Sequence, residues 1–517
     1  MPEDVKVRWQ RLELIVWAFL LAVSFNSSPF GVLAWFSLVR PLWIIGSVPA
    51  GSAFSSAYFF SFFFVGFSIW WVALVTTPGT IVAVLVVGCY YSSAFMLYRR
   101  LYQVKPILGY ISFPLLWVGI EYFRTLSEFA FPWSDLGYTQ SYFPVMIQIV
   151  SAISVHGLSL IIVAVNVLLL QMFRSELLIE KRLTSTFVAL GLILTVGLYG
   201  WVALPPYPEK GEIKLALLQG SVPLEVKWAP NNQEHSYRLY DSLTQATSDS
   251  GIQLFVWPET AAPSYLSHDP TSRRRVAGIA ERSGVPHLVG ALGATQVGDQ
   301  TKTYNSCYQF ESIVRRPVRY DKINLVPFSE HVPYQDHLVF LRKGFLQNYL
   351  TFLDQDGVQF WSDFYPGDSI LLFDVDDYSY GVLICFEAGF PEYSREMIHK
   401  GANFLVGITN DTWFGRSVGI HQHSRIFITR AIENRCWMAR VANTGLTYIV
   451  DPYGRIRHEL ELYEVAVLVG EVGSLDEYSI FTEYGDIAGK TSFVFTLSLA
   501  GVMVSIWIAR RTRKLFS

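Results

Sequence analysis

The chain divides into two regions by the pattern of its apolar and polar positions. Residues 12–204 are nearly free of charge apart from short clusters, whereas residues 205–488 alternate short β-rich runs with helix-like stretches. A transmembrane helix needs about 20 mostly apolar residues. By that length the sequence predicts eight spans, the last of them after the second region. The predicted spans are 12–28, 30–48, 54–75, 79–98, 106–124, 147–172, 185–204 and 489–509.

The main boundary falls near Leu204, in the Pro-containing segment VALPPYPEKGE. We therefore expect three parts along the chain. These are a transmembrane domain of about seven helices over 1–204, a globular domain over 205–488, and a transmembrane helix with a basic tail over 489–517.

Basic residues in short loops mark the cytoplasmic side of a membrane protein. Four basic clusters lie beside the predicted spans, and a count from a cytoplasmic N-terminus puts all four on the cytoplasmic side. The same count puts 205–488 outside, which for a bacterial inner-membrane protein means the periplasm. The clusters are Lys6, Arg8 and Arg11; Arg99, Arg100 and Lys105; Arg174, Lys181 and Arg182; and Arg510, Arg511, Arg513 and Lys514.

The second region has the pattern of an α/β domain. Its runs IKLALLQG, GVLICFE and FLVGITND are nearly continuous in Val, Ile and Leu, which predicts strands buried on both faces. Between them lie stretches with helical periodicity, such as SRRRVAGIAERSG and HSRIFITRAIENRCWMAR.

Charge, histidine spacing and cysteine spacing argue against a nucleic-acid-binding protein, a metal site and a disulfide-rich fold. Charged residues make up 16% of the 517 positions, below the usual ~25% of a soluble domain, and the net charge of −3 gives no reason to expect a nucleic-acid partner. His421 and His423 are two residues apart and so do not share a helix face, and with no third ligand in sight we expect no metal. The cysteines show no C-x-x-C spacing, which argues against a zinc ribbon or a disulfide scaffold; they are Cys89, Cys307, Cys385 and Cys436.

Three reactive side chains each end an apolar run: Glu259 in FVWPET, Lys322 in YDKINLVPF and Cys385 in GVLICFE. Taken singly, they read as a surface acid, a solvated charge and a core thiol. Taken together, they are the parts of a thiol-acylation site, in which the thiol attacks a carbonyl, the carboxylate takes its proton and the ammonium stabilises the oxyanion. A turn from strand into helix at Cys385 would also favour its thiolate.

These motifs resemble those of the apolipoprotein N-acyltransferases, a membrane branch of the nitrilase (carbon–nitrogen hydrolase) superfamily. The resemblance spans nearly the whole chain, and FPWSDLGYTQ belongs to the membrane branch alone. It implies a multi-span α-helical membrane domain joined to a nitrilase-like α-β-β-α sandwich with the reactive residues at strand ends. The motifs are FPWSDLGYTQ (131–140), QGSVPLEVKW (219–228), VWPET (256–260), DKINLVPFSEHVP (321–333), ICFE (384–387), NDTWFG (410–415), GIHQH (419–423) and ANTGLTYIVDPYG (442–454).

The resemblance also implies roles for single residues. Glu259 would be the general base, Lys322 the oxyanion stabiliser and Cys385 the nucleophile. Glu330 would pair with Lys322 and orient it, the backbone N–H of Phe386 would also face the oxyanion, and Glu387 matches an acid of the family. Phe386 departs from the family pattern, which usually has Tyr there, so any role of that hydroxyl is lost. The residues expected to bind substrate are Trp228, Trp413 and Asn443.

The implied function is transfer of an acyl chain from a membrane phospholipid, through a cysteine thioester, to the α-amine of an S-diacylglyceryl cysteine at the N-terminus of an apolipoprotein. No cofactor is needed, because the ester already supplies an activated acyl group. A membrane-anchored amidase or nitrilase acting on small soluble substrates is the alternative, but it does not explain the spans or FPWSDLGYTQ. A transporter or receptor with a degenerate nitrilase domain is disfavoured by the intact triad and by the scarcity of ionisable residues in the spans, where Glu121 and Arg124 suit an interfacial position near a span end.

One further stretch, HLVFLRKGFLQNYLTFL (337–353), is rich in apolar residues with only two charges. It predicts either an interfacial arm that dips into lipid or a buried helix.

Overall fold

The computed structural model describes residues 3–26, 29–174, 177–206, 211–229, 232–247, 251–335, 363–475 and 477–515. Two compact units are present. The first, here called the helical unit, comprises Met1–Trp70, Thr80–Leu204 and Tyr484–Ser517. The second, here called the sheet unit, comprises Trp71–Gly79 and Pro205–Glu483. The stretch 337–353, predicted as an arm or a buried helix, lies outside the described residues.

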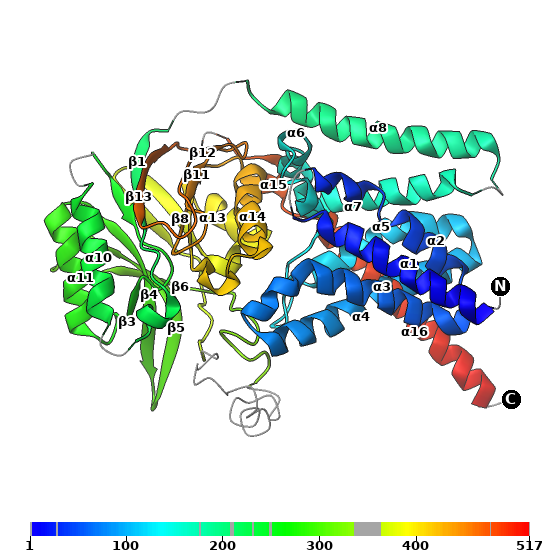
Figure 1. Cartoon of the computed structure of the whole chain (residues 1–517), viewed down its shortest axis with the longest axis horizontal. Helices are drawn as coiled ribbons and strands as arrows, with labels where there is room; N and C mark the ends of the chain where they lie inside the picture. Colours follow the sequence, from blue (N-terminus) through cyan, green and yellow to red (C-terminus); the bar gives the residue numbers. More distant parts are fainter. Residues whose placement is uncertain are drawn as a thin grey trace. The chain divides into compact units, whose positions relative to one another are not determined.

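Long apolar helices build the helical unit (Figure 1). Its elements are α1 (Glu3–Val23), η1 (Phe30–Trp35), α2 (Val39–Ser47), α3 (Ala50–Ile69), α4 (Thr77–Val104), α5 (Pro106–Phe123), η3 (Leu136–Gln140), α6 (Pro144–Ile147), α7 (Val150–Met172), α8 (Ile179–Ala203) and α16 (Ile487–Leu515). The first turn of α4 falls in the sheet unit, as does the short η2 (Trp70–Leu74) apart from its first residue.

Within the described residues, seven helical stretches are long and apolar enough to cross a membrane, where the sequence predicts eight. The difference is the first predicted span. That segment is helical in α1, but the first half of α1 carries the basic cluster and acidic residues, so it is not apolar enough by composition. The second predicted span is present as Phe30–Ser47, built from η1 and α2.

Small residues let helices of this unit approach closely. A side chain at Gly119 of α5 would lie 2.2 Å from Thr496 Oγ1 and 2.6 Å from the Ser492 carbonyl oxygen of α16. Such close contacts are typical of helix pairs in membranes, where packing and not the hydrophobic effect drives association. The C-terminal helix is thereby packed against a helix nearly 400 positions earlier in the chain.

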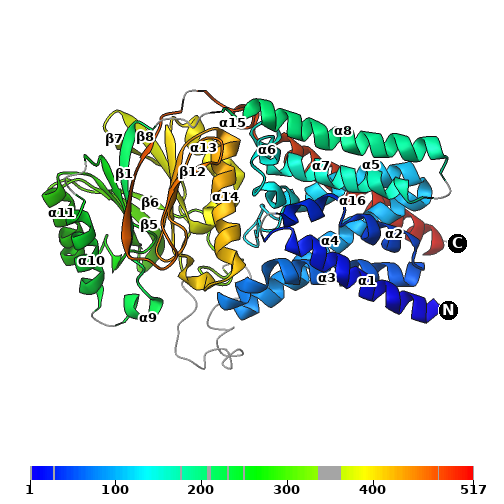
Figure 2. The ribbon, with the colours of Figure 1, turned by 45° about the horizontal axis from the view of Figure 1, so that its top comes forward.

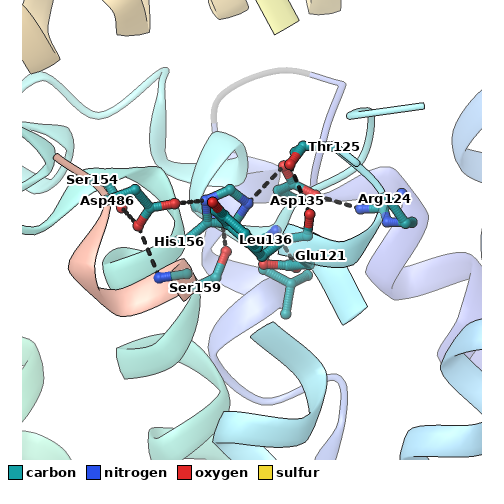
Figure 3. Close-up of polar contacts among 12 residues, drawn as sticks. Glu121, Arg124, Thr125, Asp135, Leu136, Ser154, His156, Ser159 and Asp486 are labelled. Carbon is teal, nitrogen blue, oxygen red and sulfur yellow. Dashed lines mark hydrogen bonds and ion pairs between the residues drawn. The ribbon is translucent and has the colours of Figure 1, made fainter. Parts of the chain in front are cut away.

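A cluster of buried charges joins distant segments of the helical unit (Figure 3). Arg124, just after α5, donates to the carboxylate of Asp135. The ring of His156 in α7 lies between two carboxylates, with Nδ1 2.5 Å from Asp486 Oδ2 and Nε2 3.6 Å from Asp135 Oδ2. Asp486 in turn accepts the Gly489 N–H at 2.8 Å, where α16 begins. The cluster therefore fixes the start of α16 and the loop that carries FPWSDLGYTQ.

Glu121 and Arg124, predicted at an interface near a span end, are both buried inside the protein. Glu121 Oε1 accepts the Leu136 N–H at 2.9 Å, and Arg124 donates to the Trp133 carbonyl oxygen at 2.6 Å. Charges in an apolar environment need such partners. Sequence position near a span end could not distinguish an interface from an interior, since the partners lie in the following loop.

The sheet unit contains, within its described residues, one sheet of seven strands and one of six. The first has the order β13-β1-β2-β4-β5-β6 with β3 beside β4, and the second has the order β12-β11-β10-β9-β8-β7. The strands are β1 (Ile213–Gln219), β2 (Leu254–Val256), β3 (Ala262–Tyr265), β4 (His287–Val297), β5 (Gln300–Phe310), β6 (Val318–Asp321), β7 (Leu372–Val375), β8 (Tyr378–Ile384), β9 (Phe404–Thr409), β10 (Met438–Ala442), β11 (Tyr448–Val450), β12 (Ile456–Glu459) and β13 (Ala466–Val472).

Figures 1 and 2 show these sheets packed face to face with helices on both outer sides. α10 and α11 cover the first sheet, and α13 and α14 cover the second. The predicted α-β-β-α sandwich is thus confirmed, and strands such as β9 are buried on both faces as their apolar runs predict. The helices of the unit are α9 (Leu224–Lys227), α10 (Gln233–Gln245), α11 (Pro270–Ser283), α13 (Pro391–His399), α14 (Val418–Asn434) and α15 (Ile480–Tyr484), whose last residue falls in the helical unit.

Candidate active site

The three residues predicted to react lie at the ends of three strands. Glu259 follows β2, Lys322 follows β6 and Cys385 follows β8. Lys322 Nζ is 3.6 Å from Glu259 Oε1, and both charges lie near enough to Cys385 to shift the pKa of its thiol. Residues 126 positions apart in sequence are therefore brought to one site.

Lys322 is held between two carboxylates. Its Nζ lies 2.8 Å from Glu330 Oε2 and donates to Glu330 Oε1 at 2.9 Å, and its side chain is fully buried. Burial alone would lower the pKa of Lys322, but Glu330 and Glu259 outweigh it, and the pKa lies above the usual range of a lysine. The Lys322–Glu330 pairing expected from the sequence is present, and the ammonium stays charged at any physiological pH.

Asn305, in β5, was not predicted and is a central member of this group. Its Nδ2 donates to Glu259 Oε1 at 2.7 Å and to Glu330 Oε1 at 2.8 Å. The second oxygen of Glu259 accepts the backbone N–H of Asn410 at 2.8 Å. One amide group therefore orients both carboxylates, and Glu259 is fixed from two sides.

Cys385 opens a short 3-10 turn, η7 (Cys385–Gly389), directly after β8. Its φ is +53°, in the left-handed region that costs a residue with a Cβ on the order of 1–3 kcal/mol. The residue is partly accessible, as a nucleophile must be.

Burial and the Glu259 carboxylate raise the pKa of the Cys385 thiol, against the lowering effects of Lys322 and of a contact with Thr409. The expectation that a helix start would favour the thiolate is therefore wrong. A single 3-10 turn offers little dipole, and the nearest carboxylate opposes a second negative charge. The resting group is a thiol that needs a base.

Glu387 follows the predicted nucleophile Cys385 by two residues and is fully buried. It accepts the hydroxyl of Tyr320 at 2.8 Å and the N–H groups of Ile323 at 2.7 Å and Ile384 at 2.8 Å. Burial raises the pKa of Glu387 to about 7, although the two N–H groups lower it. The acid thus ties the residue after Lys322 to the residue before Cys385 and fixes the two strand ends together.

Phe386 packs its ring against Phe390, with centroids 5.5 Å apart, and is nearly fully buried. The Phe386 ring therefore fills space in the interior.

The three residues expected to bind substrate differ in their surroundings. Trp228, after α9, is 46% exposed, and Trp413 is half-buried in η8 (Asp411–Phe414). Asn443 is buried, and its amide bonds to the Val222 backbone, with Nδ2 2.7 Å from the Val222 carbonyl oxygen. The rings of Trp228 and Trp413 are partly exposed and could contact a ligand. The side chain of Asn443 donates to Asn410 Oδ1 and so supports the neighbouring backbone.

Lys227, beside Trp228, is a second buried lysine of the site that was not predicted. Its Nζ donates to Thr260 Oγ1 at 3.2 Å. Burial lowers the pKa of Lys227 to about 8, against the raising effect of Glu259. A lysine with that pKa exchanges its proton near neutral pH.

A second group of buried charges, centred on Asp411, was also not predicted from the sequence. Asp411 is buried between Arg440, 2.6 Å away, and His423, 2.9 Å away. Burial raises the pKa of Asp411, but Arg440 and His423 outweigh it and hold the pKa well below its usual range. His423 was considered only as a metal ligand, and its position in GIHQH gave no sign of its contact with Asp411, 12 residues earlier. Within the described residues, no group of three or more His, Cys, Asp or Glu side chains is placed to hold a metal ion.

Comparisons with known proteins follow the division into two units. The carbon-nitrogen hydrolase family model matches residues 214–476, and the model of the apolipoprotein N-acyltransferase N-terminal domain matches residues 17–168. The chain is 35% identical over 505 residues to an apolipoprotein N-acyltransferase of Geobacter metallireducens, which covers 94% of each chain. It is 28% identical over 524 residues to one of Chlorobaculum tepidum, with 95% of each covered. A solved amidase of the nitrilase superfamily from Nesterenkonia matches 54% of this chain and 96% of its own at 18% identity, with a TM-score of 0.39.

Proposed function

The chain belongs to the apolipoprotein N-acyltransferase family and is a multi-pass membrane acyltransferase that N-acylates lipoproteins, and we propose that the acyl group passes through a thioester on Cys385. The observation that carries this proposal is the grouping of Glu259, Lys322 and Cys385 at three strand ends. The amidase alternative is not favoured, because the similarity extends through the helical unit as well as the sheet unit.

In the first step, Cys385 Sγ attacks the ester carbonyl carbon of a phospholipid while Glu259 takes the thiol proton. The carbonyl electrons move to the oxygen, and the resulting oxyanion lies beside Lys322 Nζ and the backbone N–H of Phe386. The C–O bond to glycerol then breaks, and the leaving oxygen takes the proton from Glu259. The products are a lysophospholipid and the thioester. The raised pKa of Cys385 supports this order, because the thiol needs its base at the moment of attack.

In the second step, the neutral α-amine of the S-diacylglyceryl cysteine attacks the thioester, and Glu259 takes a proton from the nitrogen. The C–S bond breaks, Cys385 regains the proton, and the lipoprotein leaves as an amide. Fixing of Glu259 by Asn305 and Asn410 supports a role in both steps, since the same carboxylate oxygens must meet two different nucleophiles.

The four basic clusters support an inner-membrane protein with the sheet unit in the periplasm. Phospholipid donor and diacylglyceryl acceptor are both held at a bilayer surface. A multi-pass anchor therefore keeps the enzyme where both substrates are.

Mass spectrometry of the full-length protein after incubation with phospholipid tests the proposal. We expect a mass increase of one acyl chain on Cys385, released as an N-acyl product by a diacylglyceryl-cysteine peptide. Cys385→Ala should remove the adduct, and Cys436→Ala, which changes a buried cysteine of the same unit, should keep it. Normal turnover by Cys385→Ala would sink the thioester mechanism.

A further inference from the structure

His423, on α14, contacts the backbone of Cys385 and has no role in the mechanism proposed above. Its Nε2 is 3.2 Å from the backbone carbonyl oxygen of Cys385, and its Nδ1 is 2.9 Å from Asp411 Oδ1. The side chain is 1% exposed. The imidazole thus connects a buried charge network to the backbone of the reactive residue.

The chemistry of the two partners fixes where a hydrogen must be. The Cys385 carbonyl oxygen and the Asp411 carboxylate both only accept, so both contacts are hydrogen bonds when each ring nitrogen carries a hydrogen, with Nδ1–H donating to Asp411 and Nε2–H donating to Cys385. The Arg440 guanidinium nitrogen that lies 3.3 Å from Nδ1 donates to the other oxygen of Asp411. In this form the ring presents a donor to the Cys385 carbonyl.

The ring itself is held rigidly. Phe414 and Phe427 pack edge-to-face on it, with centroids 5.5 Å and 5.1 Å away. Asp411 is anchored in turn by Arg440 and by the hydroxyl of Thr409 at 2.9 Å. A donor fixed in this way can determine the direction of the group that it binds.

The group that it binds belongs to the peptide that joins Cys385 to Phe386. A trans peptide is planar, and its C=O and N–H point in opposite directions. We propose that His423 is a positioning residue for the oxyanion: by holding the Cys385 carbonyl, it aims the Phe386 N–H at the oxygen of the tetrahedral intermediate. A hydrogen bond to the carbonyl also polarises the peptide and strengthens its N–H as a donor. The inference rests on the proposed roles of Cys385 and of the Phe386 N–H.

The backbone on the other side of the nucleophile is held as well. Glu387 accepts the Ile384 N–H at 2.8 Å, in the peptide that joins Leu383 to Ile384, and His423 contacts the peptide that joins Cys385 to Phe386. Two such restraints explain how a residue with a φ of +53° keeps an unfavourable conformation. Of the two, only the His423 contact acts on the peptide that carries the proposed oxyanion donor.

Two reactions of the same thiol separate this role from a structural one. Acylation by phospholipid passes through an oxyanion, whereas alkylation by iodoacetamide is a displacement at carbon and forms none. We expect His423→Phe to slow acylation of Cys385 on the order of a hundredfold, because loss of one oxyanion donor costs about 10²–10³ in rate. Alkylation at the same pH should change by no more than about threefold, and the KM for phospholipid should stay near that of the parent protein.

His423→Gln is the conservative partner variant, since its amide nitrogen can occupy about the place of Nε2 and donate to the same carbonyl. It should recover most of the acylation rate. His421→Phe is the matched control, because His421 lies one half-turn earlier on α14 and is exposed. It should leave both reactions unchanged.

Each outcome decides a separate point. Failure of the parent protein to form any adduct on Cys385 would overturn the proposed function itself. An adduct in the parent with equal acylation in His423→Phe would overturn the inference alone. A parallel fall of acylation and alkylation, or a His423→Gln variant as slow as His423→Phe, would overturn it too, because the donor to the carbonyl would then not be what matters.

Discussion

At the scale of single residues, the site keeps a neutral thiol beside a base. Burial and Glu259 raise the pKa of Cys385, and Lys322 lowers it. A chemical reagent that needs the thiolate should therefore react slowly at neutral pH and faster as the pH rises past the ordinary thiol range. The same charges that slow this unassisted reaction serve the proposed one, in which Glu259 takes the thiol proton as the acyl carbonyl is attacked.

Two substitutions of opposite sign test this balance. Glu259→Gln removes a negative charge, so the pKa of Cys385 should fall and the pH profile of iodoacetamide labelling should move to lower pH. Lys322→Met removes the positive charge, so the pKa should rise further and the profile should move to higher pH. Both should lose phospholipid acylation, by at least about a hundredfold. Labelling rates measured by mass spectrometry across neutral to alkaline pH check the signs; two shifts in the same direction would contradict the assignment of charges.

At the scale of elements, sequence patterns located the strand ends but not what stabilises them. FVWPE and VLICFE each end an apolar run that is a strand in the structure, whereas Lys322 follows the short strand β6, VRYD, which is not apolar. Asn305 and His423 gave no such signal, because a polar residue inside β5 or α14 has no local feature that names its partner. Glu330 was found only through its motif. The physical reason is that a strand end is a local feature of the sequence, whereas hydrogen bonds between segments far apart in the sequence are not.

The buried cluster of the helical unit gives a prediction at the same scale. Arg124→Met leaves Asp135 buried without its guanidinium, and breaking such a pair costs roughly 3–5 kcal/mol. The double variant Arg124→Met, Asp135→Leu should be less destabilised than the sum of the two single variants, because it leaves neither charge alone. Thermal unfolding in detergent measures the coupling. Arg40→Met is the matched control, since the Arg40–Glu13 pair is about one-third exposed and should contribute less than about 1 kcal/mol. Strict additivity of the two buried substitutions would show that the pair is not energetically coupled.

At the scale of the whole molecule, the number of crossings determines which side of the membrane each part faces. Seven stretches qualify as spans on length and composition in the described residues, and α1 carries too much charge in its first half to join them. Its second half, LELIVWAFLLAV, is apolar, and with α1 counted all four basic clusters fall on one side. Eight crossings place both ends of the chain on the same side of the membrane, and seven would place them on opposite sides. Labelling from each side of the membrane tests whether α1 crosses.

Single cysteines introduced at three exposed positions settle it. We expect Asp299→Cys, in the turn between β4 and β5, to react with a membrane-impermeant maleimide in intact spheroplasts, because the sheet unit would face outward. Glu180→Cys, in the first turn of α8, and Trp9→Cys, in α1, should react only after permeabilisation. A background with Cys89→Ala and Cys385→Ala removes the exposed and the partly accessible native thiols, and Cys307 and Cys436 are buried. Labelling of Trp9→Cys in intact spheroplasts with Glu180→Cys protected would mean that α1 does not cross. Labelling of Glu180→Cys with Asp299→Cys protected would reverse the proposed orientation, and the positive-inside argument would fail for this chain.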